Sequence, residues 1–234
     1  YYVFSFDNRD CGVSTKIDQF GTPNLGLAFI KSLLRLPLSA SYTLNDMAQD
    51  TVGLLDALDI ENAHIVGVSM GGMIAQIIAA RYPQRTRSLT SIMSTSGRRS
   101  LPGPTAAARK ALLSRPANPH DPDSVAEHLI RTFRIIGSPG YPTPDPVLRE
   151  RIGATVRRNV HQAGVARQLL AIAASGDRVA LLKKIQIPAL VIHGKNDPLI
   201  PIACGRDTAQ LIPGAILREI DGMGHDLAPG LHDM

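Results

Sequence analysis

The sequence predicts an α/β protein with a mainly parallel sheet and a helical cap inserted into it. Three observations carry this prediction: strand-like and helical segments alternate near both ends, the middle is only helical in pattern, and polar loops follow the predicted strands. Alternating strands and helices indicate a parallel sheet covered on both faces. We therefore predict a core formed by residues 1–97 and 185–234 and a cap formed by residues 98–184.

The first part of the chain alternates between strand and helix patterns. Tyr1–Phe6 is rich in aromatic and β-branched residues and is predicted to be a buried strand that ends in a polar loop. Thr43 and Asp46 have the spacing of a capping box, and apolar residues recur behind them at helical spacing as far as Leu58. The elements predicted next are a strand at His64–Val68, a helix at Met70–Arg81 that ends before Pro83, and a strand at Ser88–Met93.

The middle of the chain has helical patterning broken by Pro- and Gly-rich stretches, and we predict no strand there. The helices predicted in it are Ala106–Ser114, Val125–Ile136, Val147–Val160 and Val165–Ile172. Strand patterning returns at Pro188–His193 and Ala215–Ile220, on either side of a helix predicted at Cys204–Ile212. We expect the helical insertion to cover the C-terminal edge of the sheet, where ligands bind in open α/β sheets.

Composition excludes several classes of protein. Of the 234 residues, 44% are apolar and 19% charged, which is typical of a folded globular domain. The chain has no apolar run of the roughly 18 residues needed to span a bilayer, so we predict no membrane association. The two cysteines, Cys11 and Cys204, are too few for a disulfide framework and indicate free thiols in a reducing compartment, so we expect a cytoplasmic protein.

The positive charge is concentrated in the predicted cap. The net charge is +5, and between residues 98 and 184 Lys and Arg outnumber Asp and Glu by 15 to 6. These basic residues are scattered at helical spacing and the chain has no Trp, so a solvated face is favoured over a nucleic-acid surface. The chain also lacks the spacings typical of metal sites and of nucleotide-binding loops, so we predict neither metal nor cofactor.

The segment Gly67-Val68-Ser69-Met70-Gly71 has the pattern G-x-S-x-G between a predicted strand and a predicted helix. A sharp strand-to-helix turn holds such a serine in a strained conformation with its Oγ projecting from the sheet edge. We expect the turn to crowd Gly67 and Gly71, so that both positions require glycine or a residue nearly as small. In this context Ser69 is predicted to be a nucleophile, and the Met70 N–H to be an oxyanion donor at the helix N-terminus. The alternative is a glycine-rich turn that only connects the two elements.

A serine nucleophile needs a base and an orienting acid, and the C-terminal part of the chain offers both. Asp197 follows the strand predicted at Pro188–His193, and His225 follows the strand predicted at Ala215–Ile220. Both loops leave the sheet edge that carries Ser69, so we predict Asp197 as the acid and His225 as the base. His193 is the main rival base, and the rival acids are Asp207, Asp221 and Asp226, of which Asp221 is the strongest because it also follows a strand.

Four segments resemble one family over essentially the whole chain. They are Phe6–Thr15 (FDNRDCGVST), Gly67–Gly72 (GVSMGG), Gly194–Pro201 (GKNDPLIP) and Gly222–Leu227 (GMGHDL). These segments are similar to those of the α/β-hydrolase superfamily, and most similar to serine esterases related to aclacinomycin methylesterase. The resemblance implies an α/β-hydrolase fold in which Ser69, Asp197 and His225 are nucleophile, acid and base, and the Met70 N–H is one oxyanion donor.

The resemblance also implies that the chain is truncated at both ends. Members of the family begin with further strands and with a His-Gly loop that supplies the second oxyanion N–H, and they end with a closing helix. We expect that loop upstream of Tyr1, and we expect a strand to be missing between Tyr1–Phe6 and His64–Val68.

The predicted activity is hydrolysis of a hydrophobic carboxylic ester, a small molecule with a medium or bulky hydrophobic part, through an acyl-enzyme intermediate. The alternatives on the same triad are an enol-lactonase, a C–C bond hydrolase and a cofactor-free perhydrolase. A serine at position 69, in the strand-to-helix turn, argues against epoxide hydrolases and haloalkane dehalogenases, which need an aspartate there. A non-catalytic binding protein is the alternative from another class. The oligomeric state stays open.

Overall fold

Four parallel strands form one sheet in the order β1-β2-β3-β4. The computed structural model describes residues 2–232, except for the side chains of residues 32 and 33. The strands are β1 (Ala63–Val68), β2 (Thr86–Ile92), β3 (Ala189–Gly194) and β4 (Ile216–Ile220). Leu89 is in register with both Ile65 on β1 and Ala189 on β3. Because all four strands are parallel, their C-terminal ends meet at one edge, the edge where the sequence places the site.

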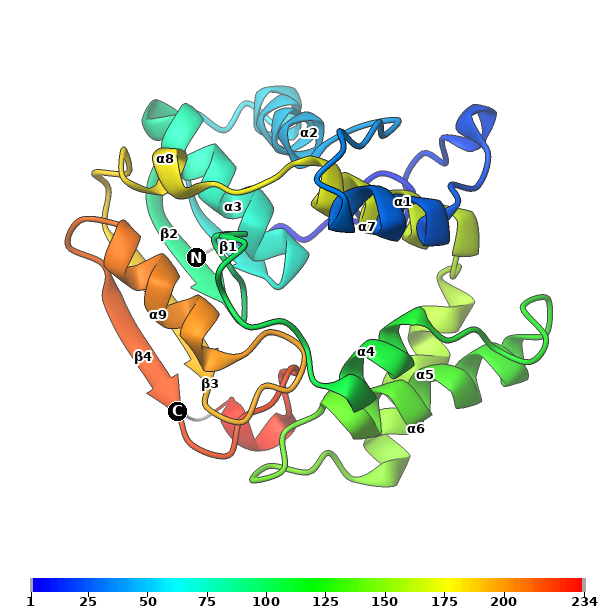
Figure 1. Ribbon diagram of the computed structural model, residues 1–234. Coiled ribbons are helices and arrows are strands. Elements are labelled where there is room, and N and C mark those ends of the chain that lie inside the picture. Colours follow the sequence, from blue (N-terminus) through cyan, green and yellow to red (C-terminus); the bar gives the residue numbers. More distant parts are fainter. Residues whose placement is uncertain (1, 233–234) are drawn as a thin grey trace.

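Helices connect the strands and pack against the sheet (Figure 1). The α-helices are α1 (Leu25–Leu33), α2 (Leu44–Ala57), α3 (Met70–Arg81), α4 (Ala106–Leu113), α5 (Pro122–Ile136), α6 (Asp145–Arg157), α7 (Gln162–Ala174), α8 (Val179–Leu182) and α9 (Ile202–Leu211). Three short 3-10 turns lie at Asp18–Phe20, Pro83–Arg85 and Pro229–Leu231. The predicted helices are found within three residues of their expected bounds, whereas α1 and α8 are additions that the sequence patterns do not predict.

The core is built around α3, which follows β1 directly. All residues of α3 from Gly72 to Ala79 are buried, so this helix is enclosed rather than amphipathic. It packs against α2, and side chains of both helices lie in the main apolar cluster with Leu89 of β2. The expected cap of α2 is present, because the Asp46 carboxylate accepts from both the N–H and the hydroxyl of Thr43 at 2.7 Å. Because α3 is buried from Gly72 to Ala79, the turn from which it starts is held in a fixed position.

The segment between β2 and β3 carries five helices and, over the described residues 98–184, no strand. Figure 1 shows α4, α5 and α6 grouped together, away from the sheet. The helices α5 and α6 share a small apolar cluster of their own, formed by Ile130, Leu148 and Ile152. In contrast, Ala171 of α7 and Leu182 of α8 belong to the main cluster. The segment therefore leaves the core through α4–α6 and returns to it through α7 and α8.

The strand predicted at Tyr1–Phe6 is wrong for residues 2–6, and Tyr1 lies outside the described residues. Residues 2–6 form no strand and are exposed, with 96% of Tyr2 open to solvent. A strand needs a neighbour that pairs with its backbone N–H and C=O groups. A cavity of about 1010 Å³ instead separates these residues from β1, and it is lined by residues 2–6, by all of β1 and by parts of α2 and α3.

Candidate active site

Ser69 occupies a strained turn between β1 and α3. Its backbone has φ 53° and ψ −116°, in the left-handed half of φ space that residues with a Cβ rarely adopt. Two contacts hold it there: the Ser69 N–H donates to Ile92 O at 2.9 Å, and the Ser94 hydroxyl donates to Ser69 O at 2.8 Å. Strain that is held by neighbouring strand ends is typical of a nucleophile displayed at a sheet edge.

The close approach of β1 and α3 explains two of the glycines around Ser69. A Cβ on Gly67 would lie 2.1 Å from Gly71 O, and a Cβ on Gly72 would lie 2.6 Å from the Ser94 Cβ. A Cβ on Gly71 meets nothing within 4 Å. The expectation that both glycines of G-x-S-x-G are crowded therefore holds for the first and fails for the second. The backbone is therefore crowded at Gly67, the last glycine of β1 before Ser69. The second crowded position is Gly72, which lies against Ser94 in the loop after β2.

Three predicted side chains meet at the C-terminal edge of the sheet. His225 Nε2 lies 3.0 Å from Ser69 Oγ, and His225 Nδ1 lies 2.7 Å from Asp197 Oδ2. His225 and Asp197 are 7% and 5% exposed, so both hydrogen bonds are shielded from water. The three side chains come from three different loops: Ser69 follows β1, Asp197 follows β3 and His225 follows β4. The structure thus brings together the three side chains chosen from the sequence, and their catalytic role stays a prediction.

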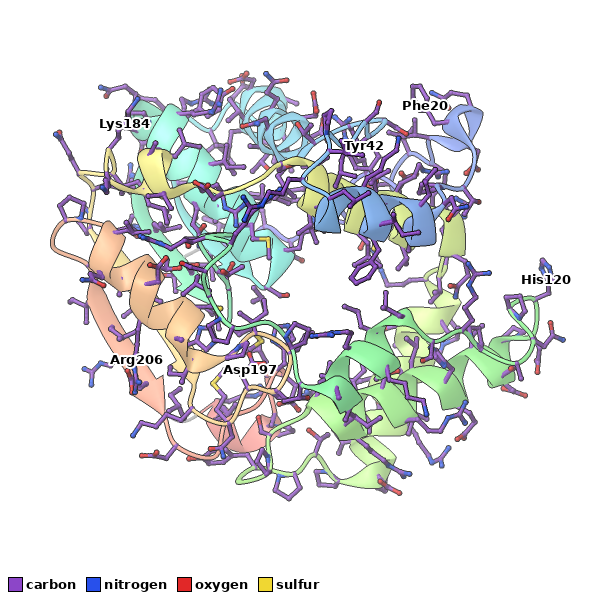
Figure 2. The ribbon with its side chains drawn as sticks, viewed as in Figure 1. Phe20, Tyr42, His120, Lys184, Asp197 and Arg206 are labelled. Carbon is purple, nitrogen blue, oxygen red and sulfur yellow. The ribbon has the colours of Figure 1, made fainter. Side chains whose placement is uncertain are left out.

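The surroundings of Asp197 fix the tautomer of His225. The other carboxylate oxygen of Asp197, Oδ1, accepts from the backbone N–H groups of Leu199 and Ile200, both at 2.8 Å. Because an ionised carboxylate only accepts hydrogen bonds, the contact with Asp197 Oδ2 requires the proton of the neutral His225 ring to be on Nδ1. That arrangement leaves His225 Nε2 as a lone-pair acceptor for the Ser69 hydroxyl proton. Figure 2 labels Asp197, which follows β3.

His193, the rival base, has other partners. It is fully buried, its Nε2 donates to Ile200 O at 2.7 Å, and the same nitrogen lies 3.7 Å from Asp197 Oδ2. Burial lowers the pKa of His193, which favours the neutral ring. A Cβ on Gly205 would lie 2.5 Å from His193 Nδ1, so α9 packs directly on the ring. His193 therefore supports the turn that carries Asp197, whereas His225 is the histidine that reaches Ser69.

The rival acids are likewise engaged elsewhere. Asp207 accepts from Ser96 Oγ and pairs with Arg98, and Asp221 forms an exposed ion pair with Lys195 at 2.9 Å. Asp226 accepts from the hydroxyl of Ser138. Asp197 is thus the carboxylate that contacts His225.

Met70 is the first residue of α3, directly after Ser69. The first N–H groups of a helix have no acceptor within the helix, so the Met70 N–H is in the right element to serve as an oxyanion donor. The sequence motifs do not point to Ser94, although its hydroxyl donates to the carbonyl of Ser69. Its position just after β2 is the feature that could have identified it, because all strand ends meet at this edge.

Residues 2–232 contain no group of three or more His, Cys, Asp or Glu side chains arranged to hold a metal ion. In the same part of the chain, no helix combines the length and apolar character needed to cross a bilayer.

Comparison with known proteins gives three kinds of match. The family model described as the alpha/beta hydrolase fold matches residues 1–228. Among curated relatives, rhodomycin D methylesterase of Streptomyces sp. (strain C5) is 26% identical over the whole chain, which spans 78% of that protein. The pimeloyl-[acyl-carrier protein] methyl ester esterase of Chromobacterium violaceum is 32% identical over 70% of this chain and 63% of its own length.

Solved structures match as well. The enol-lactonase from Burkholderia xenovorans LB400 superposes with a TM-score of 0.59 at 27% identity, covering 80% of this chain and 67% of that one. This likeness supports the arrangement of sheet and helices, and the chain spans about two thirds of that structure.

Proposed function

The chain belongs to the α/β-hydrolase family, and from that premise we propose that it is a serine hydrolase that cleaves carboxylic esters. One observation carries the proposal: a continuous hydrogen-bonded path runs from Asp197 through His225 to Ser69, with steps of 2.7 and 3.0 Å. A nucleophile, a base within reach of it and an acid that orients the base are the minimum required for acyl transfer by a serine.

Each group has a defined part in the reaction. The Ser69 Oγ attacks the ester carbonyl carbon while its proton passes to His225 Nε2. The negative charge that develops on the carbonyl oxygen is stabilised by the Met70 N–H at the start of α3. Asp197 accepts from His225 Nδ1 and stabilises the imidazolium without taking its proton. His225 Nε2 then protonates the leaving alcohol, which leaves an acyl group on Ser69.

The second half of the reaction repeats these steps with water. His225 removes a proton from a water molecule, whose oxygen attacks the acyl carbon on Ser69. Collapse of the tetrahedral species returns the proton to Ser69 Oγ and releases the carboxylic acid. The same cycle on a cyclic enol ester would be a lactonase reaction, and the likeness to an enol-lactonase structure supports testing that substrate as the second candidate.

We propose that residues 98–184 form a cap inserted in a core made of residues 1–97 and 185–234. The separate apolar cluster of Ile130, Leu148 and Ile152 supports a part of the cap that packs on its own side chains, whereas α7 and α8 join the cap to the main core. If the cap is a separate unit, amide hydrogens of α5 and α6 should exchange together and faster than those of the sheet. Exchange of α5, α6 and the strands in one step would argue against it.

The proposed substrate is a small-molecule hydrophobic ester, and the proposed location is the cytoplasm. Relatives named as a methylesterase and a methyl ester esterase support an ester, and a methyl ester among the substrates to test. Cys11 and Cys204 are both free thiols, one exposed and one buried, which supports a reducing compartment. Some arginines between residues 98 and 184 pair with carboxylates, as Arg134 does with Asp145 and Arg149 with Glu127, which supports a solvated face rather than a nucleic-acid surface. Cell fractionation tests the location.

Replacing Ser69 by alanine tests the proposed function. On a p-nitrophenyl ester, S69A should lower kcat on the order of 10⁶-fold, the scale seen when a triad nucleophile is removed. A fluorophosphonate probe should label the parent protein and leave S69A unlabelled. The matched control is S124A, because Ser124 Oγ accepts from the Asn118 N–H at the far end of α5. Equal turnover by S69A and S124A would remove Ser69 from the mechanism.

A further inference from the structure

The loop that carries His225 is tied to the segment between α5 and α6. The His225 N–H donates to Ile136 O, at the C-terminus of α5, at 2.7 Å. The Gly140 N–H donates to Gly222 O at 2.9 Å. We call residues 136–140 the strap and residues 222–227 the histidine loop. Two backbone hydrogen bonds thus fix the histidine loop to a segment more than eighty residues earlier in the chain.

Ser138 adds a side-chain contact at the centre of the strap. Its hydroxyl donates to the Asp226 carboxylate and accepts from the Gly224 N–H at 2.9 Å. Ser138 is 4% exposed, so the Gly224 N–H has no solvent to replace this acceptor. The hydroxyl therefore holds the residues on both sides of His225, one through its N–H group and the other through its side chain.

The backbones of the strap and the histidine loop are in direct contact. A Cβ on Gly224 would lie 2.2 Å from Gly137 O, and a Cβ on Gly140 would lie 2.8 Å from the Gly222 Cα. This approach is closer than any side chain allows, so the two segments meet through glycines. Because no side chain lies between the two backbones at these contacts, a displacement of the strap must also displace the histidine loop.

We propose that Ser138 and Asp226 are positioning residues that hold His225 in reach of Ser69, so that α5 and α6 act on the reaction through the strap. This inference rests on the proposed function of Ser69 and His225. Proton transfer needs a heavy-atom separation of about 2.6–3.2 Å, and the His225 Nε2 to Ser69 Oγ distance is 3.0 Å. A small shift of the histidine loop therefore moves the base out of range, whereas it leaves the binding of a small ester almost unchanged.

Four variants test the inference: S138A, D226A, D226N and the control S124A. We expect S138A and D226A to lower kcat by about 10- to 100-fold, the range for a displacement of about 1 Å, with KM of a small p-nitrophenyl ester nearly unchanged. D226N keeps an oxygen that accepts from Ser138, so it should retain most of the parental kcat. S124A loses the same kind of hydroxyl-to-backbone bond at the other end of α5, about 18 Å away along its axis, and should match the parent.

A second measurement does not depend on turnover. In the parent, the His225 Nδ1–H that donates to Asp197 should give a hydrogen-bonded, slowly exchanging proton resonance in NMR of ¹⁵N-histidine-labelled protein. We expect this resonance to be lost or broadened in S138A and D226A and retained in D226N and S124A. If the parent neither turns over esters nor reacts with a fluorophosphonate, the proposed function fails and this resonance alone decides the inference.

Three results would overturn the proposal. The first is parental kcat and an unchanged His225 resonance in S138A and D226A. The second is a loss of kcat that only follows the folded fraction measured by circular dichroism. The third is a D226N variant as impaired as D226A, which would assign the effect to the charge of Asp226 instead of its bond to Ser138.

Discussion

Replacing Arg167 by methionine removes the cation from a buried ion pair that joins the N-terminal loop to α7. Arg167 Nε and Nη2 donate to the two oxygens of Asp10, both at 2.8 Å. The side chains of Arg167 and Asp10 are 1% and 0% exposed. Asp10 also accepts from the hydroxyl of Tyr42, labelled in Figure 2, and from the Ile17 N–H, each at 2.8 Å. Methionine keeps most of the side-chain volume, so R167M tests the charge rather than the packing.

The structure sets the size of the expected loss. Without Arg167, Asp10 stays buried with two neutral donors and no counter-charge, and removing one partner of such a pair costs about 3–5 kcal/mol of unfolding free energy. For a chain of this size each kcal/mol lowers Tm by about 2–4 °C, so R167M should melt about 6–20 °C below the parent. Urea unfolding and calorimetry at pH 7 measure the two quantities. The control is D18N, because Asp18 is an exposed partner of the same guanidinium and should matter far less.

The stability lost in R167M should depend on pH, and the pKa of Asp10 determines in which direction. Burial alone would raise the pKa of Asp10, but hydrogen bonds from Arg167, the Ile17 N–H and Tyr42 outweigh it and hold that pKa well below its usual value. A lowered carboxylate pKa adds stability that is complete above the unfolded pKa of about 4 and is lost as the pH falls further. The difference between parent and R167M should therefore be largest near neutral pH and shrink in acid. A loss under about 1 kcal/mol at pH 7, or a gap that is constant into acid, would refute the reasoning.

Three further predictions concern the site. G67A should fail to form the turn, because its Cβ would lie 2.1 Å from Gly71 O; expression as folded, probe-reactive protein would contradict this. D197N should lower kcat by about 10⁴-fold with little change in Tm, because an amide there favours the wrong tautomer of His225; a pH profile and melting curve check it, and parental turnover would count against it. Burial lowers the pKa of His193, so its contribution to stability is present above about pH 6.5 and falls as the pH drops. The parent should thus lose stability between about pH 7 and 5, and H193Q should have a flatter slope in urea titrations; an unchanged slope would exclude His193 as the cause.

Local patterns predicted most of the secondary structure correctly. The helix at Met70–Arg81 matches α3 at both ends, because a strand, a glycine-rich turn and a proline mark its limits within the sequence itself. The Thr43–Asp46 cap is likewise a contact between neighbours in the chain. The strand at residues 2–6 failed for the opposite reason. Its composition suits a strand, but a strand also needs a partner, and a cavity separates these residues from β1.

The sequence by itself determined the family, the four strands and seven of the nine α-helices of the described residues, and the three residues proposed for the reaction, because these depend on motifs and spacing along the chain. Only the tertiary structure decided which contacts form between distant segments. It ties His193 to Ile200 and packs α9 on its ring, and it crowds Gly72 against the loop after β2. It also joins Ser138 to the histidine loop. Such contacts depend on how the ends of several strands and helices pack, and no local sequence pattern specifies which distant residues come within contact distance.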